Sequence, residues 1–146
     1  MVRLLLMLSM ILGSGASARA QLGYTAAPDE AHYVLLLVDP DYGDVLELSA
    51  EVARYQLRYY KDAPLSYRAI RLLRRPERFA VQVTGFANEA AALRYTTLLE
   101  QRRPDFTRER MLRDYYPIGK TNFAVLYRAQ SLPEYRAFAR RRYTAE

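Results

Sequence analysis

The sequence predicts an α+β fold built on a four-stranded antiparallel sheet, and three observations support this prediction. Short segments at 32–38, 67–73 and 79–84 are either continuously apolar or alternate apolar with polar residues, as β-strands do. Apolar residues at helical spacing separate the first two segments and follow the third. The order strand, helix, strand, strand, helix needs one more strand to complete the βαββαβ arrangement of a ferredoxin-like sandwich, which has its helices on one face.

The first strand is expected at 32–38, because a run this short and this apolar is typical of a central strand. A helix is expected over 45–60. Asp44 precedes its first turn, and Glu47, three residues later, allows a capping box. The residues that define its buried face recur at steps of four, three and four: Leu48, Val52, Tyr55 and Tyr59.

The strands at 67–73 and 79–84 are joined by a short connection, so we expect them to form an antiparallel hairpin. Asn88 then begins a second helix as its N-cap residue, and Pro104 ends it. The apolar residues that share one face of this helix are Ala91, Ala92, Tyr95, Leu98 and Leu99.

Two segments compete for the fourth strand. The local pattern favours 122–127, whereas 115–120 contains Pro117, which a strand tolerates only at an edge or a bulge. A last, extra C-terminal helix follows, since Ser131 and Glu134 have the spacing of a capping box. Its expected buried face contains Leu132, Tyr135, Phe138 and Ala139.

The composition restricts the classes of function. The 146 residues include no Cys, one His, and 22 Lys and Arg against 16 Asp and Glu. This length fits one domain, expected at 32–146. Without Cys there is no disulfide, no thiolate nucleophile and no Cys-bearing zinc site. The single histidine, His32, leaves little room for a mechanism that needs two.

The N-terminus has the pattern of a secretory signal peptide at 1–20, with an early arginine, an apolar stretch and small residues before the cleavage site. Residues 21–31 are expected to form a short leader. Removing the signal peptide takes away Arg3 and Arg19 and lowers the net charge from +6 to +4. We therefore expect an exported protein with no transmembrane segment in the mature chain. Nucleic acid is an improbable partner for such a protein.

Two clusters invite a catalytic or metal-binding interpretation, and neither meets its requirements. Asp39, Asp41 and Asp44 lack the glycine and the final glutamate of a calcium-binding loop, so a turn that caps a helix explains them better. His32 begins an apolar strand, where a hydrogen-bonded structural role is the default. We expect no enzyme, no metal and no cofactor. An enzyme that uses His32 with a nearby carboxylate stays open as an alternative.

The 13 tyrosines are the least ordinary feature of the composition. Tyrosine combines apolar area with a polar tip and is frequent at binding surfaces. Most tyrosines lie on the predicted buried faces, which indicates core packing for four or five of them. The candidates for a partner-binding surface are Tyr60, Tyr115, Tyr116 and Tyr143.

The segment 116–123, with the sequence YPIGKTNF, is followed by Leu126-Tyr127 and by an aromatic pattern that ends at Tyr143. Together with stretches at 32–35, 53–60 and 86–95, it resembles the C-terminal domain of the SprE/PorW-type gliding-motility and type IX secretion lipoprotein of Bacteroidetes. The chain looks like a small stand-alone exported relative of that domain. The resemblance implies that the fourth strand lies at 115–120 and that 122–128 is helical.

This resemblance implies a non-enzymatic binding or accessory module of the cell envelope, in the periplasm or on the periplasmic side of the outer membrane. Its partner would be a cell-envelope protein, such as a component of the type IX secretion or gliding machinery, bound through an open sheet face or edge. The alternative is a SPOR-like domain that binds peptidoglycan, since such domains have the same strand order and use a sheet face.

Overall fold

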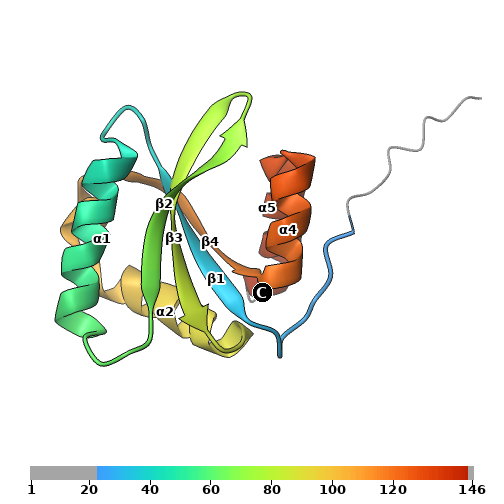
Figure 1. Ribbon diagram of the computed structural model, residues 1–146, viewed down its shortest axis with the longest axis horizontal. Helices are drawn as coiled ribbons and strands as arrows, with labels where there is room; N and C mark the ends of the chain where they lie inside the picture. Colours follow the sequence, from blue (N-terminus) through green and yellow to red (C-terminus); the bar gives the residue numbers. More distant parts are fainter. Residues whose placement is uncertain (1–22, 145–146) are drawn as a thin grey trace, which may run out of the picture.

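The structure is a computed structural model that describes residues 23–144. The expected signal peptide at 1–20 lies outside the described residues. A four-stranded sheet carries helices on both of its faces (Figure 1). Its elements in chain order are β1 His32–Val38, α1 Val45–Tyr59, β2 Ser66–Arg74, β3 Glu77–Phe86, α2 Glu89–Arg102, α3 Asp105–Arg108, β4 Leu112–Gly119, α4 Lys120–Ala129 and α5 Leu132–Tyr143.

The strands lie in the order β2-β3-β1-β4, and every neighbouring pair is antiparallel. Leu36 of β1 is paired with Val81 of β3 on one side and with Tyr115 of β4 on the other. The register of β1 and β3 shifts near Gly85, whose φ of +109° suits a bulge that only glycine adopts easily. The predicted α+β class and ferredoxin-like sandwich with an extra C-terminal helix are confirmed.

Strand β1 separates two hydrophobic cores, because its side chains alternate between the two faces of the sheet. Val34 and Leu36 pack with α1 and α2, while Leu35 and Leu37 pack with α4 and α5. All four side chains are buried. Helices therefore cover both faces at β1, and the sheet face that we expected to be open to a partner is occupied by α4 and α5 (Figure 1).

The first two helices begin where the sequence predicts. Asp44 accepts hydrogen bonds from the backbone N–H groups of Leu46 and Glu47, and Glu47 completes the capping box. Asn88 accepts from the backbone N–H of Ala91 at the start of α2. Ser131 occupies the N-cap position of α5, but its side chain makes no capping bond, so the capping box expected there is not formed.

The fourth strand is β4, as the resemblance implied, and the local interpretation of 122–127 as a strand is wrong. That segment lies inside α4, where Asn122 and Leu126 are one helical turn apart and both buried. A short apolar run fits a strand and a buried helix equally well, so its pattern could not decide. Pro117 is accommodated because β4 is an edge strand.

The last turn of α1 departs from its predicted buried face. Tyr59 is 40% exposed, whereas Gln56 is buried and donates a hydrogen bond to the hydroxyl of Tyr95 at 3.1 Å. Four-residue spacing indicates which face of the helix is apolar, but it does not indicate how many turns of that face are buried, and Tyr59 is the last residue of α1.

Residues 23–31, expected as a leader, are packed against the C-terminal helices. The ring of Tyr24 meets the ring of Tyr135 at a centroid distance of 5.1 Å. The amide of Asn122 exchanges two hydrogen bonds with the backbone of Thr25, at 2.8 and 3.1 Å. Glu30 accepts from the backbone N–H and the hydroxyl of Thr121. These contacts extend the second core beyond the predicted domain boundary at residue 32.

Within the described part of the chain, none of the helices is both long enough and apolar enough to cross a membrane.

The capping box gives a direct test of how α1 begins. Replacing Asp44 with Ala leaves two N–H groups of the first turn without their acceptor, so we expect the free energy of unfolding to fall by about 1 kcal/mol in urea titrations. Asp41→Ala is the matched control, because Asp41 is an exposed aspartate of the same turn and its change should stay within about 0.5 kcal/mol. Equal effects from both variants would contradict the capping role.

Candidate functional site

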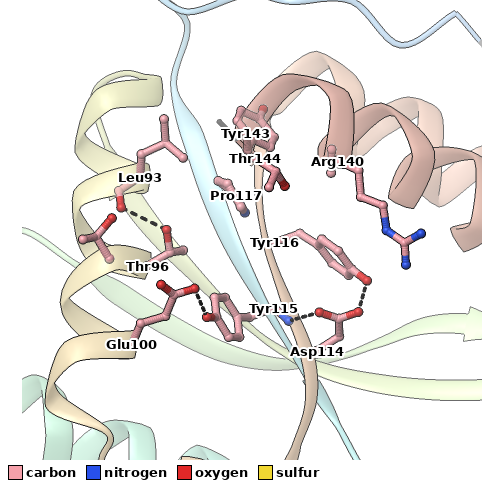
Figure 2. A pocket seen from close by; sticks show the side chains of 12 residues that line it. Leu93, Thr96, Glu100, Asp114, Tyr115, Tyr116, Pro117, Arg140, Tyr143 and Thr144 are labelled. Carbon is pink, nitrogen blue, oxygen red and sulfur yellow. Dashed lines mark hydrogen bonds between the residues drawn. The ribbon is translucent and has the colours of Figure 1, made fainter. Parts of the chain in front are cut away.

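Three of the four candidate tyrosines meet in one groove, which runs along the free edge of β4 between α2 and α5 and has a volume of about 400 Å³. We call it the β4 groove (Figure 2). Tyr115, Tyr116 and Tyr143 line it. Other side chains that line it include Leu93, Thr97, Glu100, Asp114, Pro117 and Arg140.

The strand geometry explains why two adjacent tyrosines both reach this groove. Neighbouring side chains of a strand point to opposite faces, so Tyr115 packs on the side of α2 and Tyr116 on the side of α5. Figure 2 shows the two rings diverging from β4 in this way. Tyr143 comes from the last turn of α5. The groove therefore surrounds a strand edge and draws on both layers of helices.

Asp114 organises the polar part of the groove. Its Oδ1 accepts a hydrogen bond from the backbone N–H of Tyr115 at 3.0 Å, and its Oδ2 accepts from the hydroxyl of Tyr116 (Figure 2). Arg136 donates from Nε to the Tyr116 hydroxyl at 2.7 Å and lies 3.7 Å from Oδ2 of Asp114. On the other side, the Tyr115 hydroxyl donates to Glu100. Both tyrosine rings are thus held in fixed orientations.

The free edge of β4 is blocked against strand addition at Tyr115 and Pro117. Pro117 has no backbone N–H, and its carbonyl oxygen accepts a hydrogen bond from the hydroxyl of Tyr135 at 2.5 Å. The N–H of Tyr115 is taken by Asp114, as described above. An incoming strand needs free backbone donors and acceptors at an edge. Recognition through the β4 groove must therefore depend on side chains.

The opposite edge of the sheet, β2, is closed at one end only. The side-chain amide of Gln130 accepts from the N–H of Arg74 at 2.9 Å and donates to the carbonyl of Leu72 at 3.3 Å. This amide takes the place of a neighbouring strand at these two residues. Farther along β2, the residues at 66–69 are exposed to solvent.

Burial raises the pKa values of the groove tyrosines. The pKa of Tyr116 rises to about 12, first because the ring is buried and then because its hydroxyl donates to the charged Asp114. Burial and Glu100 likewise raise the pKa of Tyr115, and burial raises that of Tyr143. These phenols stay protonated at neutral pH, so they act as hydrogen-bond donors and as apolar walls, not as bases or nucleophiles.

Tyr60, the fourth candidate, lies outside the β4 groove. Its ring packs against those of Tyr55 and Tyr95, on the face of the sheet that α1 and α2 cover. Tyr59, which was expected on the buried face of α1, and Tyr127 of α4 are both exposed. The tyrosines thus divide between core and surface, but helical spacing alone did not predict correctly which tyrosines belong to each group.

His32 has a structural environment. It is 1% exposed, its Nδ1 lies 2.9 Å from the carbonyl oxygen of Glu30, and its Nε2 lies 3.9 Å from Glu89. Arg142 in turn donates two hydrogen bonds to the Glu89 carboxylate, at 2.9 and 3.2 Å. This arrangement ties the start of α2 to the end of α5. None of these four residues lines the β4 groove.

The three aspartates before α1 act as the sequence indicated. Asp39 accepts from the N–H of Asp41 at 3.1 Å, which forms a turn, and Asp44 caps the helix. Among residues 23–144, no three His, Cys, Asp or Glu side chains are placed to hold a metal ion together.

Several residues of the β4 groove were missed by sequence reasoning. Thr97, Glu100 and Arg140 are exposed residues on helical surfaces, and surface residues of this kind carry no local signal of a site. Asp114 precedes two tyrosines in an edge strand, but its role could not be predicted because Arg136, which lies beside it, comes from α5. Finding these residues required the packing of α2 and α5 around β4.

Comparisons of the chain with protein-family models, with curated proteins and with solved structures find no match.

The raised pKa of Tyr116 predicts a specific loss of stability in alkali. Tyrosines of the unfolded chain ionise near pH 10, whereas Tyr116 in the folded chain ionises near 12. Between these values the folded state binds more protons, so the free energy of unfolding falls as pH rises. We expect Tyr116→Phe to make this fall shallower in urea titrations performed from pH 10 to pH 12.

The control for this experiment is Tyr127→Phe, which removes the hydroxyl of an exposed tyrosine. The difference in tyrosinate absorbance between wild type and each variant along the same titration reports when the removed phenol ionises. Equal slopes for wild type and Tyr116→Phe would contradict the assignment.

Proposed function

We propose that this chain is an exported, non-enzymatic accessory module of the cell envelope that binds a segment of another envelope protein in the β4 groove. It would act in the periplasm or on the periplasmic side of the outer membrane. The convergence of Tyr115, Tyr116 and Tyr143 on one solvent-open groove supports this proposal most strongly. Tyrosines held in fixed orientations offer large contact area at little cost in conformational entropy.

The proposed mode of binding is side-chain insertion. The backbone of β4 is closed to an added strand by Asp114, Pro117 and Tyr135. The groove beside it offers aromatic walls with hydroxyls that are already oriented. A partner segment would place one or two apolar or aromatic side chains between α2 and α5 and would not need to extend the sheet.

The charges of the groove define the chemistry of the partner. Glu100 lies on one wall and holds the Tyr115 hydroxyl, which leaves carboxylate lone pairs free for another donor. Arg140 lies on the wall formed by α5. A Lys or Arg of the partner segment, next to its apolar side chain, would form an ion pair with Glu100. An acidic residue on the other side of that apolar side chain would form an ion pair with Arg140.

A connection with type IX secretion or gliding machinery is part of the proposal and rests on the resemblance of 116–123 and its flanking motifs. The peptidoglycan-binding alternative has less support. A SPOR-like mode uses an open sheet face, and the face opposite α1 and α2 is packed with α4 and α5 along β1 and β4. Sedimentation with purified sacculi tests this alternative directly, because only a glycan binder would be pelleted with them.

Filling the groove tests the proposal without removing any core side chain. Thr97 is exposed on α2 and lines the groove, so Thr97→Arg would place a long side chain in it. We expect recovery of the partner from envelope extracts to fall at least about tenfold, which corresponds to about 1.4 kcal/mol. Ala124→Arg introduces the same side chain and the same change of charge at an exposed position of α4; it is the control and should leave recovery unchanged.

A photo-activated cross-linking residue at position 97, compared with one at position 124, identifies the partner. Under the proposal, position 97 gives a discrete adduct with one envelope protein, and Thr97→Arg abolishes the recovery of that same protein. Unchanged recovery with Thr97→Arg, or identical adducts from both positions, would overturn the assignment of the groove.

A further inference from the structure

A second hollow lies on the other side of α2, where the C-terminal half of α1 meets the junction of α2 and α3. Its volume is about 680 Å³. We call it the arginine hollow, because five arginines line it: Arg54, Arg58, Arg102, Arg103 and Arg108. The carboxylates among its lining residues are only Glu51 and Asp105. The hollow therefore carries an excess of three positive charges.

The two carboxylates are already used by two of the arginines. Arg54 is paired with Glu51 on α1, and Arg108 is paired with Asp105 on α3. Both are pairs of residues three positions apart on one helix, so they neutralise each other locally. Among residues 23–144, no carboxylate lies within ion-pair distance of Arg102, of Arg58 or of Arg103.

Arg102 is held in place by three tyrosines. Its Nη1 donates to the hydroxyls of Tyr55 at 3.3 Å and Tyr60 at 3.4 Å. Its guanidinium carbon lies 4.1 Å from the centre of the Tyr59 ring, which fits a cation–π contact. The described contacts involve Nη1 and the face of the guanidinium. Its Nε and Nη2 are left as donors for another group.

A second guanidinium lies over the same ring. The guanidinium carbon of Arg58 is 5.3 Å from the centre of Tyr59. Two like charges beside one exposed tyrosine repel each other, and the described residues supply no negative charge between them. An anion that contacts both guanidiniums would remove this repulsion and would use the N–H groups that the tyrosines leave free.

We propose that the arginine hollow binds a phosphate monoester or inorganic phosphate through the guanidiniums of Arg102 and Arg58. A phosphate monoester carries close to two negative charges at neutral pH, which matches the combined charge of Arg102 and Arg58, neither of which is paired with a carboxylate in the described part of the chain. Its three terminal oxygens accept the forked donors of arginine better than a single carboxylate does. This site is separate from the β4 groove, since the two share no lining residue.

Calorimetric titration of the purified chain with inorganic phosphate, and with acetate as a singly charged comparison, measures the proposed preference. We expect phosphate to bind at least about tenfold more tightly than acetate. Arg102→Gln and Arg58→Gln should each weaken phosphate binding at least about tenfold. Arg58 is exposed and makes no hydrogen bond within the described residues, so Arg58→Gln tests the site even if Arg102→Gln disturbs the tyrosines around it.

The matched control is Arg75→Gln at the tip of the β2–β3 hairpin, which removes one exposed positive charge away from the hollow. It should change the phosphate affinity less than about twofold. An equal loss in Arg75→Gln and Arg58→Gln would show that only net charge matters and would overturn the proposal. So would equal affinity for phosphate and acetate.

Vesicles separate the two sources of a phosphate group. Phosphatidic acid presents a phosphate monoester and phosphatidylglycerol presents a diester, each mixed into phosphatidylcholine. Co-sedimentation with phosphatidic acid alone, abolished by Arg58→Gln, would identify a lipid headgroup as the ligand. Binding of inorganic phosphate without binding to vesicles would identify a soluble phosphate ester. Binding to neither phosphate nor phosphatidic acid would overturn the proposal.

Discussion

The arrangement of the whole molecule depends on the burial of β1 from both sides. Val34 and Leu36 point into one core and Leu35 and Leu37 into the other, and all are removed from water. A strand with two apolar faces is stable only where each face is covered, so helices must lie on both. The chain meets this requirement with α1 and α2 on one face and α4 and α5 on the other.

Both candidate sites follow from this layering. Because α2 and α5 pack on opposite faces next to an edge strand, they flank β4 and leave a groove along its free edge. The C-terminal end of α2 lies near the end of α1, where Arg102 donates hydrogen bonds to Tyr55 of α1 and to Tyr60, the C-cap residue of α1. One helix therefore contributes a wall to each site. The tyrosines serve both, as oriented donors in the groove and as supports for guanidinium groups in the hollow.

The sequence was sufficient for features that depend on neighbouring residues. The capping box of Asp44 and Glu47, the hairpin and the helix that Asn88 begins all lie where local patterns predicted. It was insufficient where contacts between distant segments determine the secondary structure. The local pattern of 122–127 favours a strand, but this segment is part of α4, which packs on the sheet. For the sites, Tyr115 and Tyr116 could be selected as a pair, but the carboxylates and arginines around them belong to segments brought together by folding.

The protection of the sheet edges has an evolutionary consequence. At β4 it depends on the missing N–H of Pro117 together with Asp114 and Tyr135, and at one end of β2 it depends on the amide of Gln130. Pro117 and Gln130 are each one side chain at one position, and neither fills the core as Leu35 does. Replacing Pro117 would restore one backbone donor, and replacing Gln130 would free the N–H of Arg74 and the carbonyl of Leu72, while both cores stay intact. Variants that lose this protection would therefore keep the fold and still expose backbone groups to pairing with a second chain, which makes edge-to-edge assembly reachable by substitution.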